Sequence, residues 1–310
     1  MFKSDRFFLM VVSIVMFSLF LVGCGNGEEN QPQDEVVTDE NEGLYIVTSF
    51  SILNDVVSEI IGDRGTVDYI VPIGEEPHEY EPIPSDFQKV SDADVFYING
   101  FNLEEWLEGL VQNVGDVPTV EVTESITPIK LEGGDVDDPH SWMNVTNVIT
   151  KVETIVNDLV ERDPEGEEVY RENAAAYIEE LEELDGWIAE QVEQIPEDMR
   201  VIVVSEDAFK YFGEAYGMET EGIWELNSHE EGTPSQMSRV VDVVRDRQLP
   251  AIFVETTVSR SYMETVSDNT GVDIAGEVYT DAVGVEGSGA ETYIKMMEHN
   301  VNTFVDGLTQ

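Results

Sequence analysis

From residue 44 onward, short apolar runs alternate with segments of helical periodicity, and this alternation constrains the fold more than any other feature. The strand-like runs of the first part are 44–50, 66–72, 93–100 and 119–122, and the helix-like segments are 51–61, 84–92 and 102–114. Two long helical patterns follow, at 141–160 and 164–195. Strands that alternate with helices form parallel sheets through right-handed crossovers. The pattern therefore predicts an N-terminal α/β lobe over 44–163.

A second alternating series begins at Arg200. Its strand-like runs are 200–206, 220–226, 251–258 and 274–281, and its helix-like segments are 208–217, 233–248, 259–270 and 290–308. Pro164 and Pro196 mark the start and the end of the long helical pattern between the two series. We expect an α/β fold of two lobes with parallel sheets flanked by helices. One long linker helix (164–197) would join the N-terminal lobe to a C-terminal lobe over 198–310.

The first residues have the features of an export signal. Lys3 and Arg6 precede the apolar run 7–22, which is short for a membrane-spanning helix of about 20 residues. The run ends in LVGC, which resembles the lipobox of bacterial lipoproteins. We therefore predict a lipoprotein signal peptide over 1–24, with Cys24 lipidated; an uncleaved anchor is the alternative. Either way the body lies on the extracytoplasmic face of the cell membrane.

The segment after Cys24 is polar and acidic. Residues 25–43 contain few apolar side chains and read as a disordered, self-repelling tether. Cys24 is the only cysteine, which excludes an intramolecular disulfide. A body tethered in this way is expected to work close to a membrane component.

Acidic residues are spread along the whole chain. With 66 acidic and 15 basic side chains the formal net charge is −51. Such a charge repels phosphate backbones, so nucleic acid is excluded as a partner. Either the protein is adapted to concentrated salt, which screens self-repulsion, or it is simply an acidic exported protein. We favour salt adaptation, which predicts that stability rises steeply with salt.

Functional residues are expected beyond the carboxyl ends of the strands, where open α/β sheets bind ligands. His78 follows the strand-like run 66–72, and His140 begins a helical pattern. Glu206 and Asp281 are each the last residue of a strand-like run of the second series. Two imidazoles from one lobe and two carboxylates from the other would form a metal site in the cleft between them.

The sequence lacks the motifs of several other common chemistries. The sequence has no HExxH, no Cys-x-x-Cys, no phosphate-binding loop and no G-x-S-x-G motif, so zinc-protease, phosphate-handling and nucleophilic mechanisms lack a starting point. His229 and His299 are read as ordinary solvated histidines. Tyr80, Trp142 and Trp224 either line the site or pack in the core.

Five motifs in order resemble a known family: PHEYEPIPSD, DPHSWMNV, SEDAFKYFGEAYG, IWELNSHEEGTPSQ and VYTDAVG. They are similar to those of the TroA-like solute-binding lipoproteins of manganese, iron and zinc ABC importers, over about residues 44–310. The resemblance implies two lobes bridged by a rigid helix and one metal bound between them. It places the metal ligands at His78, His140, Glu206 and Asp281. It also implies a monomeric carrier, not an enzyme, that delivers its cargo to a membrane permease with a cytoplasmic ATPase.

The cargo metal is predicted from the third ligand. In this family, zinc-specific members often have histidine at that position and a histidine-rich loop between the first two ligands. Here the third ligand is Glu206, and no histidine lies between His78 and His140. Because hard carboxylates suit Mn²⁺ and Fe²⁺, we rank manganese first, iron second and zinc third. A zinc-specific binding protein of the same family remains an alternative.

Two positions depart from the family pattern. His229 stands where an acidic or small polar residue is expected, and Ala282 stands where serine is common. Two other classes of protein also stay open at this point. An extracellular metallohydrolase would use the same four residues, and a surface adhesion module would need an exposed apolar or basic patch.

Overall fold

The computed structural model describes residues 43–131, 134–226 and 232–310, which belong to one compact unit. The expected signal peptide, the lipidation site at Cys24 and almost all of the expected tether lie outside the described residues, as does His229. No helix within the described ranges is long and apolar enough to cross a membrane.

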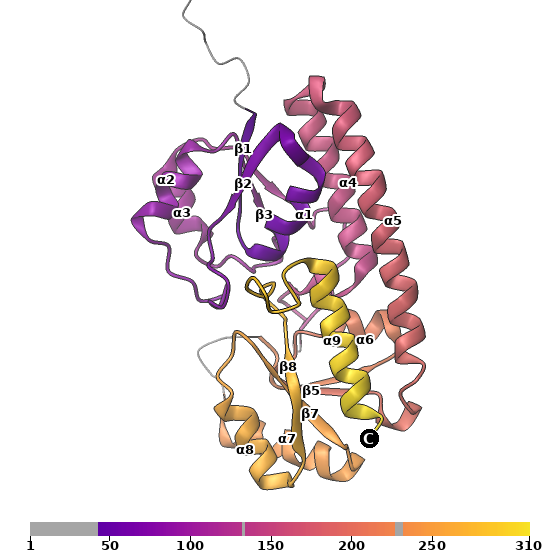
Figure 1. Cartoon of the computed structure of the whole chain (residues 1–310). Helices are drawn as coiled ribbons and strands as arrows, with labels where there is room; N and C mark the ends of the chain where they lie inside the picture. Colours follow the sequence, from indigo (N-terminus) through magenta and orange to yellow (C-terminus); the bar gives the residue numbers. More distant parts are fainter. Residues whose placement is uncertain (1–42, 132–133, 227–231) are drawn as a thin grey trace, which may run out of the picture. The chain divides into compact units, whose positions relative to one another are not determined.

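The N-terminal half (residues 43–162) is built on one parallel sheet. Its four strands lie in the order β2–β1–β3–β4 (Figure 1). The strands are β1 (Leu44–Thr48), β2 (Gly65–Tyr69), β3 (Val95–Ile98) and β4 (Thr119–Glu121). Successive residues of β1 face opposite sides, so Ile46 and Val47 belong to separate apolar clusters. Helices cover both faces, as expected for a parallel sheet.

The helices of this half begin and end at local signals. They are α1 (Ser51–Ile61), α2 (Pro84–Asp92), α3 (Leu107–Val114) and α4 (Val145–Arg162). The side chain of Asn144 caps α4 by accepting a hydrogen bond from the backbone N–H of Thr146. The predicted helix over 102–114 begins late, at Leu107. Phe101 and Asn102 have φ of 53° and 63°, a left-handed conformation that excludes them from a helix.

A single long helix, α5 (Glu167–Val192), connects the two halves in sequence and has 26 residues. Its buried side chains recur at helical spacing: Tyr170, Ala174, Tyr177, Leu181, Leu184, Ile188 and Val192. α5 packs against α1 and α4 of the N-terminal half and also against α9, near the C-terminus (Figure 1). The first turn of the predicted pattern, Pro164–Gly166, is a 3-10 turn.

The C-terminal half (residues 201–310) contains two parallel strand pairs. β5 (Val201–Glu206) pairs with β6 (Glu219–Trp224), and β7 (Ala251–Glu255) pairs with β8 (Asp273–Val278). β5 and β7 also contact each other. The surrounding helices are α6 (Lys210–Tyr216), α7 (Pro234–Arg247), α8 (Ser261–Thr270) and α9 (Tyr293–Leu308).

The predicted fold class is confirmed: parallel sheets flanked by helices, with one long helix between the two strand-containing halves. Helix ends differ from the predicted ones by a few residues because capping and turn geometry decide them. The predicted lobe and linker boundaries, 44–163, 164–197 and 198–310, stay a prediction.

Candidate metal centre

The structure brings all four predicted ligands together from both halves of the chain. His78 lies in the loop between β2 and α2, and His140 immediately precedes the 3-10 turn Ser141–Met143. Glu206 is the last residue of β5, and Asp281 lies in the loop after β8. The four residues are between 0% and 3% exposed. Such burial of ionisable side chains is expensive unless they are paired or bind an ion.

The donor atoms of these residues converge. His78 Nε2 lies 3.3 Å from His140 Nε2 and 3.7 Å from Glu206 Oε1. His140 Nε2 lies 3.8 Å from Glu206 Oε1 and 3.4 Å from Asp281 Oδ1. Donor atoms that share a metal at about 2.1 Å lie roughly 3–3.5 Å from one another. A small contraction of this cluster would therefore fit one transition-metal ion.

Asp138 orients the imidazole of His140. Its Oδ1 lies 2.8 Å from His140 Nδ1 and also accepts the backbone N–H of His140 at 2.9 Å. The Nε2 atom is thereby directed toward Glu206 and Asp281. On its far side, Asp138 Oδ2 lies 3.5 Å from Lys210 Nζ. A carboxylate behind a histidine is typical of metal ligands, because it fixes the tautomer and the ring orientation.

His78 is held differently. Its Nδ1 is buried without a hydrogen-bond partner among the described residues, and its backbone N–H donates to Glu76 Oε1 at 3.0 Å. Glu76 also places a carboxylate oxygen within 4.8 Å of oxygens of Glu206 and Asp281. Its side chain is 20% exposed, so it lies at the outer edge of the cluster. Glu76 was not predicted from the sequence, although its place two residues before His78 was a usable signal.

The two imidazoles have opposite pKa shifts in the metal-free site. Burial, and then the nearby charge of His140, lower the pKa of His78 to about 4. Burial also opposes the charged form of His140, but Asp138, Asp281 and Glu206 outweigh it and raise the pKa of His140 well above its usual value. The surrounding carboxylates thus favour the charged form of His140, whereas burial favours the neutral form of His78. A metal ion would displace a proton carried by His140.

Glu255 supports the carboxylate side and was also missed. It is the last residue of β7, and its carboxylate accepts the backbone N–H groups of Ser205 (3.1 Å) and Glu206 (2.6 Å). Burial raises the pKa of Glu255 to about 7. Its position at a strand end, directly after AIFV, matches the signal that identified Glu206.

Among the aromatic candidates, Trp142 borders the site. Its ring centroid lies 5.3 Å from that of His140, and its Nε1 donates to the carbonyl of Thr280 at 2.8 Å, linking the two halves. Tyr80 donates its hydroxyl hydrogen to Asp86 at 2.8 Å and so stabilises the start of α2.

The other residues singled out from the sequence make contacts typical of packing and hydrogen bonding. Trp224 packs edge-on against Tyr262 in the core of the C-terminal half. His299 Nε2 lies 3.0 Å from the carbonyl oxygen of Glu277, away from the four predicted ligands. Ala282 is 3% exposed beside Asp281.

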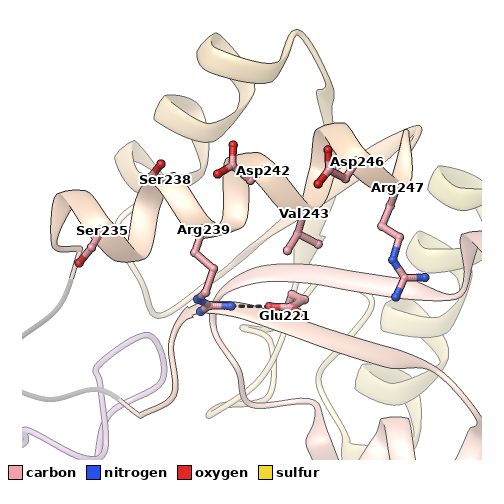
Figure 2. A pocket seen from close by; sticks show the side chains of 8 residues that line it. All are labelled: Glu221, Ser235, Ser238, Arg239, Asp242, Val243, Asp246 and Arg247. Carbon is pink, nitrogen blue, oxygen red and sulfur yellow. Dashed lines mark hydrogen bonds and ion pairs between the residues drawn. The ribbon is translucent and has the colours of Figure 1, made fainter.

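A separate hollow of about 650 Å³ lies between α7 and β6 (Figure 2). Arg239 forms an ion pair with Glu221 across it. The lining residues are Glu221, Ser235, Ser238, Arg239, Asp242, Val243, Asp246 and Arg247. None of them is a predicted ligand, and within the described part of the chain none belongs to a cluster of His, Cys, Asp or Glu side chains that could hold a metal ion.

Comparison with known proteins identifies the family. Residues 46–307 match the family model described as zinc-uptake complex component A, periplasmic. The chain belongs to this family. It is 62% identical to the manganese-binding lipoprotein MntA of Halalkalibacterium halodurans, over 96% of this chain and 97% of that protein.

More distant family members carry the names of other metals. The chain is 38% identical to the iron ABC transporter substrate-binding lipoprotein MtsA of Streptococcus pyogenes serotype M1, over 88% of this chain and 91% of that protein. Its structure superposes on the periplasmic zinc-binding protein TroA of Treponema pallidum with a TM-score of 0.83. That comparison has 28% sequence identity and covers 86% of this chain and 100% of TroA. The family thus shares one fold among proteins named for different ions.

Proposed function

We propose that this chain is the extracytoplasmic substrate-binding lipoprotein of a metal ABC importer. It binds one divalent transition-metal ion as cargo and delivers it to a membrane permease that is driven by a cytoplasmic ATPase. The observation that carries the proposal is the buried convergence of two imidazoles and two carboxylates from opposite halves of the chain. The ligands are His78, His140, Glu206 and Asp281.

Manganese is the proposed cargo, ahead of iron and zinc. Two carboxylates give the site hard oxygen donors, which favour Mn²⁺ and Fe²⁺ more than an all-imidazole site would. The 62% identity to a manganese-binding lipoprotein supports the same order. Zn²⁺ is expected to bind tightly in vitro even so, because it lies above Mn²⁺ in the Irving–Williams order.

The chain acts as a carrier and not as an enzyme. Four protein side chains would surround the ion, whereas a catalytic metal keeps a position open for water or substrate. We further propose that Cys24 carries the lipid anchor, that the chain works as a monomer, and that 44–163 and 198–310 form lobes joined by a linker helix at 164–197. Relatives with the word lipoprotein in their names support the anchor.

Metal analysis of the full chain, purified in detergent and high salt, tests the proposal. We expect one equivalent of metal per chain, and saturable binding when the metal-free protein is titrated with Mn²⁺, Fe²⁺ and Zn²⁺. Glu206→Ala should abolish or greatly weaken this binding. Glu221→Ala, which removes a carboxylate from the hollow between α7 and β6, should leave it unchanged. Binding that is indifferent to Glu206, or absent in the wild type, would refute the proposal.

A further inference from the structure

Lys151 is a buried lysine outside the set of four predicted metal ligands. It lies on α4 and is only 3% exposed, on the inward side of the helix with Val148, Val152 and Ile155. Transferring an ammonium group out of water is costly unless specific partners compensate it. A lysine in the middle of an apolar helix face therefore calls for a role beyond packing.

The ammonium group has two partners, and both lead to His140. Its Nζ donates to Asn99 Oδ1 at 2.5 Å and lies 5.3 Å from the centroid of the Trp142 ring. Among the described residues, no carboxylate lies within 4 Å of it to form an ion pair. Burial lowers the pKa of Lys151 to about 7, and the charge of Glu104 partly offsets this shift.

Asn99 carries the first connection. It follows β3 and is completely buried, and its Nδ2 donates to the carbonyl oxygens of Gly100 (3.0 Å) and Pro139 (3.1 Å). An ammonium group can donate but cannot accept. The contact with Lys151 therefore identifies the oxygen end of the Asn99 amide and directs its NH₂ group toward Pro139, the residue before His140.

The backbone at Asn99 is itself fixed by a buried carboxylate. Glu104 accepts the backbone N–H of Asn99 at 2.7 Å and that of Gly100 at 3.1 Å. The Asn99 side chain thus projects from a rigid turn. Its amide orientation is then set from both ends, by the carbonyls of Gly100 and Pro139 at Nδ2 and by Lys151 at Oδ1.

Trp142 carries the second connection. Lys151 Nζ lies over its ring, 5.3 Å from the centroid, and the centroid of the His140 ring also lies 5.3 Å from that of Trp142. A cation over an indole face is an attractive contact. Lys151 is therefore linked to the segment 139–142 on both sides of His140. Asn99 connects it to the Pro139 carbonyl, and its ammonium group contacts the Trp142 ring directly.

We propose that Lys151 is a positioning residue of the metal site, which orients the Asn99 amide and supports Trp142 so that His140 Nε2 is held in place for the ion. This role rests on the proposed function. Partners behind a ligand typically change metal affinity by about 10–100-fold, and Lys151 acts through one more residue. We therefore expect an effect of about three- to tenfold.

The test compares the full-length wild type with Lys151→Met, which keeps an unbranched side chain that is one atom shorter and removes the donor. We expect Mn²⁺ binding to weaken about three- to tenfold. Thermal stability is measured alongside, because the change removes a buried ammonium group but leaves the buried Asn99 Oδ1 without its donor. The visible spectrum of bound Co²⁺, used as a probe of ligand geometry, should change as well. Asn99→Asp keeps an acceptor for Lys151 but loses the donor to Pro139, and should weaken Mn²⁺ binding in the same way.

Tyr170→Phe provides the control. Tyr170 is buried in the N-terminal half and donates to Asp163 at 2.6 Å, away from the predicted ligands. Loss of this hydrogen bond should lower thermal stability while leaving Mn²⁺ affinity and the Co²⁺ spectrum unchanged. Wild-type affinity and spectrum in Lys151→Met, or a loss of affinity that merely follows stability in all three variants, would overturn the positioning role and leave the proposed function intact. A wild type that binds no metal would overturn both.

Discussion

The imidazole side and the carboxylate side of the site are supported by different parts of the fold. Glu206 ends a buried strand, and its backbone is bonded to the carboxylate of Glu255 at the end of a neighbouring strand. His78 and His140 lie outside the strands, in segments held by side chains. Glu206 is thus fixed by sheet backbone. Asp281, in the loop after β8, accepts hydrogen bonds from the hydroxyls of Thr257 and Thr280, and like the two nitrogen donors it depends on polar side chains.

The two histidines also differ from each other in how many hydrogen bonds hold them. Asp138 holds His140 at both its ring and its backbone, and Asn99 holds the preceding carbonyl. His78 has no hydrogen-bond partner at Nδ1 within the described part of the chain. We infer that His140 is the fixed nitrogen donor and that His78 completes the site around an ion.

The largest expected change in metal affinity comes from replacing a carboxylate of the site with a third imidazole. Glu206→His would replace a strand-end oxygen donor with a third imidazole. We expect Mn²⁺ affinity to fall at least about a hundredfold while Zn²⁺ affinity changes far less, because imidazole suits zinc better than manganese. Competition titrations with both ions would measure this, with Glu221→His as a surface control. An equal loss for both ions would show that the carboxylate does not set the preference.

A second prediction concerns the support of the carboxylate side. The pKa of Glu255 is raised to about 7 in the fold, so ionising it costs folding free energy. This cost is absent below its unfolded pKa of about 4.3 and complete above pH 7, so the contribution of Glu255 to stability falls as pH rises. Glu255→Gln should remove a pH-dependent loss of roughly 3–4 kcal/mol.

Urea unfolding of the metal-free wild type and variant from pH 4.5 to 7.5 would measure this difference. The wild type should lose stability relative to Glu255→Gln across that interval. Glu277→Gln, an exposed carboxylate on β8, is the control and should show no such trend. A constant difference between wild type and Glu255→Gln would mean that Glu255 is not the group that ionises.

A third prediction separates the two histidines by their protonation. The pKa of His140 is raised and that of His78 is lowered to about 4, so between pH 5 and 7 only His140 carries a proton that the metal must displace. Metal binding should release about one proton, and affinity should rise about tenfold per pH unit in that range. Calorimetry in buffers of different ionisation enthalpy would count the protons. Release of two would mean that both imidazoles are charged in the metal-free site.

The sequence predicted what depends on local periodicity. Alternating apolar runs located the strands, and the rule that ligands bind at their carboxyl ends led to Glu206 and Asp281. The late start of α3 was missed because it depends on the left-handed backbone of Phe101 and Asn102, which few non-glycine residues adopt.

The supporting residues were missed for a different reason. Lys151 contacts Asn99 across 52 residues of sequence, and Glu255 reaches Glu206 across 49. Neither periodicity nor a motif reveals such pairs among 66 acidic side chains. The usable hints were a lysine within the apolar face of α4 and a glutamate at the end of β7.

Burial of the ligands also has a consequence for kinetics. All four side chains are at most 3% exposed, and the partly exposed Glu76 lies at their edge. An ion therefore cannot enter or leave unless a loop or side chain moves first. The residence time of the ion should then follow the frequency of that opening more closely than the strength of its bonds. Two ions of unequal affinity could leave at similar rates, so the opening step would determine how fast cargo is handed over.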